Sequence, residues 1–148
     1  MLIPSILYLF DRDLNKLKEE IELYSKEENL WIIDQNISNS AGNLSLHLIG
    51  NLKTYIGAEL GDTGYIRERE LEFSLKNISR TELLKAIDET KAIVNQALEK
   101  LTETDLQKEY TLIKNYPFKT TYHLLIHLTV HLGYHLGQIN YHRRLLDK

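Results

Sequence analysis

Histidine is concentrated near the end of this chain, in a pattern that could hold a metal ion. The segment TYHLLIHLTVHLGYHLGQI places His123, His127, His131 and His135 four residues apart. In an α-helix each such step rotates by only about 40°, so neighbouring members of the series point the same way, one turn apart. His131 and His135 could therefore hold one ion between them, and an imidazole from another helix would complete a three-ligand site.

His47 is the candidate for that third ligand. It stands alone in LSLHLIGNL, far upstream of the other five histidines. Its spacing puts it on an edge of the second predicted helix, where it could face either the histidine pair or solvent. A single buried histidine is more often a core residue bonded to a neighbour than a ligand. Four in succession are harder to explain that way, because each ring needs partners for both nitrogens.

The remaining histidines are expected to have other roles. His123 and His127 lie further round the last helix, so they are expected to line a cavity or to hydrogen-bond a ligand imidazole rather than to bind the ion. His127 is the candidate general base, because the unperturbed pKa of histidine lies near the working pH. His142 is flanked by Tyr141 and two arginines, and we expect it on the surface.

Two amides are candidates for hydrogen bonds to a ligand imidazole or to a substrate. Asn51 follows His47 by one turn, and Gln138 lies three residues after His135. Partners of this kind fix the tautomer and the orientation of a ligand ring. The alternative is that both are ordinary polar residues at a helix margin.

Composition restricts the class of protein. The chain has 148 residues, 43% hydrophobic and 26% charged, which predicts a single domain over residues 1–148 with one core. The net charge is -3 without a basic block, so nucleic acid is not an expected partner. The absence of cysteine excludes thiolate ligands, disulfides and a cysteine nucleophile. The opening MLIPSILYLF is short and lacks a positive leading region, so we expect a helix, a cytoplasmic protein and no membrane partner.

Apolar residues recur at three- and four-residue spacing in four long segments, which predicts an all-α protein. A Ser79/Glu82 capping box should begin the third helix, whereas YIRERELEF is ambiguous. A loop, SNSAGN, precedes the second helix, and a long connection at 102–119 contains Tyr116 and Pro117. A compact four-helix bundle is expected, although periodicity leaves the helix directions open. The predicted helices span about 3–24, 44–60, 80–101 and 120–146.

The passage GNLSLHLIGNL, followed much later by HLTVHLGYHLGQI, resembles the DinB-like, or YfiT-like, superfamily of metal-dependent enzymes. Members have one histidine on the second helix and an HxxxH pair on the last. The likeness extends over essentially the whole chain and includes the Gly137-Gln138 that trails the pair. It implies that His47, His131 and His135 ligate one divalent ion, in a four-helix bundle of up-down-down-up order that is often dimeric. GDTG and YIRERELEF look more like a poorly characterised branch than like the known enzymes.

Three neutral imidazoles would leave the full positive charge on an ion with an open coordination position. Such a centre would lower the pKa of bound water toward about 7, or bind a substrate thiol as thiolate. Zinc is the expected ion, with nickel and iron also suited to imidazole. Characterised members of the superfamily include transferases and isomerases that use low-molecular-weight bacterial thiols. The resemblance therefore favours a transferase that activates a small thiol, with a hydrolase as the other reaction.

Two non-enzymatic interpretations remain beside the transferase or hydrolase. The chain could be a metal-binding bundle without turnover, acting as a structural or protein-interaction module, or a purely structural bundle with stacked histidines. An open coordination position with a pocket that reaches solvent would distinguish an enzyme from a closed structural site. Tyr134 and Tyr141 could line the mouth of a cavity or pack against a second subunit in a homodimer.

Overall fold

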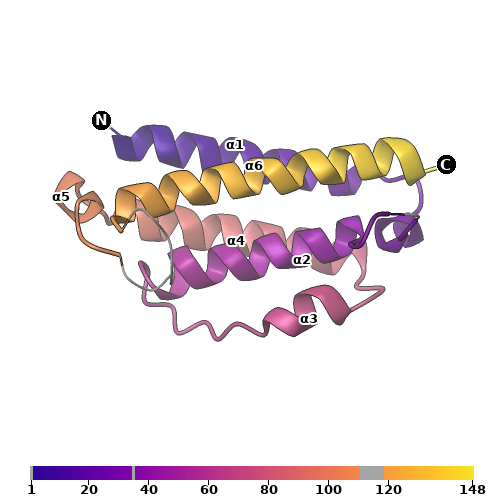
Figure 1. Ribbon diagram of the computed structural model, residues 1–148, viewed down its shortest axis with the longest axis horizontal. Helices are drawn as coiled ribbons and strands as arrows, with labels where there is room; N and C mark the ends of the chain where they lie inside the picture. The colour runs from indigo at the N-terminus through magenta and orange to yellow at the C-terminus, as the bar shows by residue number, and fades with distance from the viewer. Residues whose placement is uncertain (1, 35, 111–118) are drawn as a thin grey trace.

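The computed structural model describes residues 2–34, 36–110 and 119–148, and within these ranges it is helical without a β-strand. Four long helices lie side by side (Figure 1), and these are α1 (Leu2–Glu22), α2 (Ala41–Leu52), α4 (Arg80–Glu99) and α6 (Thr121–Leu146). The connections contain the short helices α3 (Arg69–Ser74) and α5 (Glu103–Leu106), a 3-10 turn at Glu27–Trp31 and a π-helical turn at Lys53–Ala58. The all-α prediction is confirmed for the described residues.

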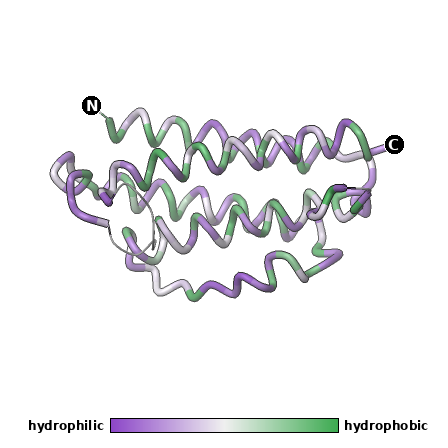
Figure 2. The backbone as a smooth tube through the Cα atoms, in the orientation of Figure 1, coloured by the Kyte–Doolittle hydropathy of each residue, from purple (hydrophilic) through white to green (hydrophobic). Residues whose placement is uncertain are grey.

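The core lies between the four long helices. Helices α1 and α2 each pack against both α4 and α6, and apolar residues recur along each of the four at the spacing of a buried stripe (Figure 2). Each large apolar side chain that becomes fully buried contributes about 1.5–3 kcal/mol. This packing holds α2 beside α6, the two helices that carry the candidate ligands. Fully buried core residues include Phe10, Leu14, Leu17, Leu48, Leu52, Leu83, Ile87 and Leu128.

Hydrogen bonds at the helix starts explain where these helices begin. The Ser79 hydroxyl accepts from the backbone N–H of Glu82, whose carboxylate accepts from the backbone N–H of Ser79, so the predicted capping box is present. Ser40 caps α2 by accepting from the N–H of Asn43. The second helix therefore begins at Ala41, and the last three residues of SNSAGN belong to it rather than to a loop.

The second helix also ends differently from the prediction. Regular α-helix stops at Leu52, and the chain continues as the π-helical turn Lys53–Ala58. The Thr54 hydroxyl donates to the Gly50 carbonyl at 2.7 Å. Threonine bonds of this kind compete with the helical ladder and bend the helix.

The ambiguous segment YIRERELEF contains all of α3 except its last residue, Ser74, and this helix packs against α2. In Figure 1 the chain from α2 to α4 passes along the outer side of α2, with α3 in it. The side chain of Asn43 on α2 donates to the backbone carbonyls of Glu72 and Leu75. Hydrogen bonds from the Asn43 side chain to main-chain carbonyls therefore hold α3 against the start of α2.

Part of the predicted connection at 102–119 lies outside the described residues, including Tyr116 and Pro117. No helix in the described part of the chain is both long and apolar enough to cross a membrane.

Candidate metal centre

His47 on α2 and His131 and His135 on α6 meet between the two helices. Each offers one ring nitrogen, and the three nitrogens lie within 4.8 Å of one another. Nε2 of His47 is 3.2 Å from Nε2 of His131. A tetrahedral zinc ion with Zn–N bonds of about 2.0–2.1 Å separates its ligand nitrogens by about 3.3 Å. The donor set and its spacing therefore fit one divalent ion.

Burial favours the neutral form of His47 and His131, which metal binding requires. Burial, followed by the neighbouring His135 and His47, lowers the pKa of His131 to about 4. Burial also lowers the pKa of His47, although Glu72 acts in the opposite direction. Nδ1 of His131 is buried and has no hydrogen-bond partner among the described residues. Protonation of both ring nitrogens would place an uncompensated positive charge in this buried position.

In both His47 and His135, Nδ1 is hydrogen-bonded to an oxygen acceptor. Nδ1 of His135 lies 2.7 Å from the side-chain oxygen of Gln138, and Nδ1 of His47 lies 3.0 Å from a carboxylate oxygen of Glu72. Because these oxygens accept, each Nδ1 carries the proton and each Nε2 keeps its lone pair. Both rings are thus in the tautomer that can bind an ion through Nε2. Gln138 occupies the position relative to His135 that its spacing predicts.

Sequence reasoning missed Glu72 and its partner Arg67. Glu72 is buried on α3, and Arg67 donates to both of its carboxylate oxygens, from Nε at 2.8 Å and from Nη2 at 2.9 Å. The ambiguous periodicity of YIRERELEF concealed this pair. One signal was available: Gly50 follows His47 by three residues on the same side of α2, so it leaves room beside the histidine for a side chain from another segment.

A family profile described as "Protein of unknown function (DUF1572)" matches residues 9–148. The chain belongs to the DUF1572 family. The match includes every residue of the three-histidine group and the Arg67–Glu72 pair. A comparison with curated proteins gives no match. Membership of the DUF1572 family states no activity, so the chemistry of the centre is argued from its geometry.

The other predicted residues lie around the centre. His127 is exposed, and its ring stacks on that of His131 at a centroid distance of 6.2 Å. His123 is two turns before His131, and its Nδ1 is 2.6 Å from the hydroxyl of Thr120, the residue that caps α6. Asn51 is buried one turn after His47, and its side-chain oxygen has no hydrogen-bond partner in the described ranges. The roles predicted for these residues remain predictions.

The surface prediction for His142 is wrong. The side chain is 4% exposed, and both ring nitrogens are bonded. The Tyr24 hydroxyl lies 2.7 Å from Nδ1, and Nε2 donates to the backbone carbonyl of Ile32 at 2.8 Å. In this DUF1572 chain His142 is a core histidine that joins α6 to the segment after α1.

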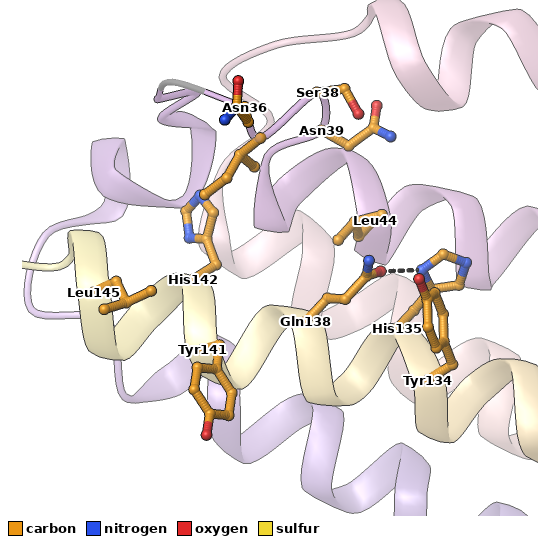
Figure 3. A pocket seen from close by; sticks show the side chains of 11 residues that line it. Asn36, Ser38, Asn39, Leu44, Tyr134, His135, Gln138, Tyr141, His142 and Leu145 are labelled. Carbon is orange, nitrogen blue, oxygen red and sulfur yellow. Dashed lines mark hydrogen bonds between the residues drawn. The ribbon is translucent and has the colours of Figure 1, made fainter.

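A pocket of about 420 Å³ opens beside His135. Figure 3 shows Gln138 pointing toward His135, with Tyr134 next to the same ring. Tyr134 and Tyr141 line the pocket, which is one of the two roles considered for them. Among the described residues, its lining contains no aspartate, glutamate, lysine or arginine. The other lining residues are Asn36, Ile37, Ser38, Asn39, Leu44, His142 and Leu145.

Proposed function

We propose that this chain is a cytoplasmic metal-dependent enzyme, a transferase that activates a small thiol, with hydrolysis as the other reaction the same centre could support. The observation that carries the proposal is the convergence of His47, His131 and His135, with their ring nitrogens within 4.8 Å of one another. Zinc is the proposed ion, and nickel or iron would suit the same imidazoles.

A divalent ion bound by these nitrogens would supply Lewis acidity that activates a thiol or water. The chain's own residues prepare the centre for an anionic partner. The three rings are uncharged ligands, and the carboxylate that hydrogen-bonds His47, that of Glu72, is paired with Arg67. Since no ligand neutralises the ion, a thiolate is a more favourable fourth ligand than a neutral group.

The pocket beside His135 supports an enzyme over a closed structural site. Its volume of about 420 Å³ is within the usual range for small-molecule sites. Amides, hydroxyls and aliphatic side chains line it, so it suits a substrate whose body is uncharged and partly apolar. The charged group of such a substrate would be the thiolate at the ion.

His127 is proposed as the general base. It is exposed and stacked on His131, so it lies beside the centre without belonging to the three-histidine group. A ring in this position could accept a proton from a substrate thiol that reaches the ion.

We also propose that the fold is the DinB-like four-helix bundle. In Figure 1, α1 and α6 run in one direction, and α2 and α4 run in the other. This order supports the up-down-down-up arrangement that the resemblance implies. The homodimer that the resemblance also implies stays a proposal, and it would use tyrosines exposed on α6.

The test is a conjugation assay with zinc-loaded and metal-free protein. A panel of small thiols is offered an electrophile, and a panel of esters is assayed in parallel for hydrolysis. The proposal expects turnover that requires the ion and is lost in the His131→Ala variant. If zinc-loaded protein turns over neither panel, the alternative of a non-catalytic metal-binding module replaces the enzyme.

A further inference from the structure

Glu72 is a buried carboxylate that hydrogen-bonds Nδ1 of His47, the ring nitrogen that is not directed toward the other two histidines. It is 6% exposed and accepts three hydrogen bonds, one from His47 Nδ1 and two from the guanidinium of Arg67. A buried carboxylate is costly unless it is paired and hydrogen-bonded. The Arg67 fork satisfies this requirement and fixes the carboxylate plane, because two parallel bonds define its orientation.

The carboxylate determines which nitrogen of His47 carries the proton. An ionised carboxylate has no proton to donate, so Nδ1 of His47 must be the donor in the 3.0 Å bond. Nε2 is then left with its lone pair, directed toward Nε2 of His131 at 3.2 Å. Phe73, the residue after Glu72, packs against the same imidazole at a centroid distance of 5.0 Å.

Docking of α3 onto α2 does not depend on this carboxylate alone. The side chain of Asn43 bonds the main-chain carbonyls of Glu72 and Leu75 at 2.9 and 2.8 Å. The carboxylate itself lies against Gly50, where a Cβ atom would overlap Oε2 of Glu72. The surface of α2 is thus shaped to admit the carboxylate next to His47.

We propose that Glu72, held by Arg67, is a positioning residue that sets the tautomer and orientation of His47 for the metal ion. This inference rests on the proposed function of the three histidines. Carboxylates that accept from a ligand histidine raise metal affinity, and their loss typically weakens it by about 10–100-fold. Pairing with Arg67 lets Glu72 do this without adding net charge to the centre.

The first test is Glu72→Gln. An amide nitrogen in the place of Oε1 sets a donor against His47 Nδ1 and Arg67 Nη2, and one in the place of Oε2 sets a donor against Arg67 Nε. The first orientation breaks the bond to His47, and the second breaks the Arg67 fork that holds the side chain beside it. We expect zinc affinity, measured by competition with a chromogenic chelator, to fall by about 10–100-fold. In the metal-free variant, ¹⁵N NMR should show His47 losing its preference for the Nδ1–H tautomer. Glu70→Gln is the matched control, because Glu70 is an exposed glutamate on the same short helix.

Gly50→Ala is a second, independent variant that keeps both charges of the Glu72–Arg67 pair. Its methyl group would displace the carboxylate from His47, so zinc affinity should again fall and the tautomer should change. Thermal melting of the metal-free variants accompanies both measurements. If both lower the melting temperature yet keep wild-type affinity and the wild-type tautomer, Glu72 is only a structural contact and the inference is overturned. If the wild-type chain binds no zinc, the proposed function itself fails.

Discussion

The Tyr24 hydroxyl donates a 2.7 Å hydrogen bond to Nδ1 of His142, which ties the segment after α1 to the last helix. Nε2 of His142 donates to a backbone carbonyl, so Nδ1 is the acceptor in the neutral ring. Burial lowers the pKa of His142, although the carbonyl acts in the opposite direction, and burial raises the pKa of Tyr24. The pair is therefore an uncharged bond inside the core.

His142→Ala should destabilise the protein by about 2–4 kcal/mol, because it opens a cavity and leaves the buried Tyr24 hydroxyl with only a long, 3.5 Å bond to the Ile139 carbonyl. Tyr24→Phe, which removes only the hydroxyl, should cost about 1–2 kcal/mol. Urea unfolding of the two variants measures both effects. Zinc binding should be retained in each, and a loss of zinc in the folded His142→Ala variant would contradict the assignment of this residue to the core.

Metal-free protein should lose stability as the pH falls from 7 to 5. The pKa of His131 is lowered to about 4, and the pKa values of His47 and His142 are also lowered, in each case first by burial. In this range the unfolded chain binds more protons at these rings than the folded chain does, so stability is present above the unfolded histidine pKa and declines below it. Urea unfolding at a series of pH values tests this. A slope of zero between pH 7 and 5 would be incompatible with neutral buried rings.

Alanine at position 47, 131 or 135 should abolish tight zinc binding, because two protein nitrogens are too few for a stable site. The loss should exceed the roughly 10–100-fold effect expected for residues outside the ligand set. His127→Ala should keep its zinc but lose turnover if His127 is the base. Elemental analysis and the conjugation assay, carried out on the same samples, separate the two outcomes. Full zinc occupancy in the His47→Ala variant would contradict the assignment of His47 as the third ligand.

Removal of the ion should lower the melting temperature, since an ion that joins α2 to α6 binds only the folded chain. At a free zinc concentration of 100 times the Kd, the ion would add about 2.7 kcal/mol. Differential scanning calorimetry before and after chelation gives the shift. The same melting temperature after verified removal would argue against zinc as a link between the helices.

If the chain forms a homodimer, its sedimentation coefficient at micromolar concentration should be above that of a monomer. Val130, Tyr134 and Tyr141 are 66%, 64% and 63% exposed on α6, and they are among the apolar residues that such an interface would cover. Val130→Lys should then shift the population to monomer without affecting zinc binding. A wild-type chain that sediments as a monomer would exclude the interface.

The features that were predicted correctly are those determined by residues close together in the sequence. The spacing of apolar residues reports one buried helix face, so four long helical segments could be predicted, and the spacing of His131 and His135 brings them together within one helix. The Ser79–Glu82 cap is also a local contact. The exact ends of α2 depend on Ser40 and on the π-helical turn, which apolar spacing does not register.

Contacts between distant segments were harder to predict. Glu72 reaches His47 from a six-residue helix, too short to show a periodic pattern. His142 was misplaced because its neighbours in sequence are polar, yet consecutive residues on a helix point about 100° apart. Arg143 next to it turns toward α1 and binds Glu20 at 2.8 Å, while His142 faces the core.

The close approach of Gly50 to Glu72 restricts how the DUF1572 family can vary. A chain with any side chain at position 50 would have to move or lose the carboxylate at position 72, and a chain without that carboxylate would no longer need a glycine. The two positions are 22 residues apart in sequence, but they should change together among relatives. Glycine at 50 should accompany glutamate at 72, and Arg67 should be retained where both are present.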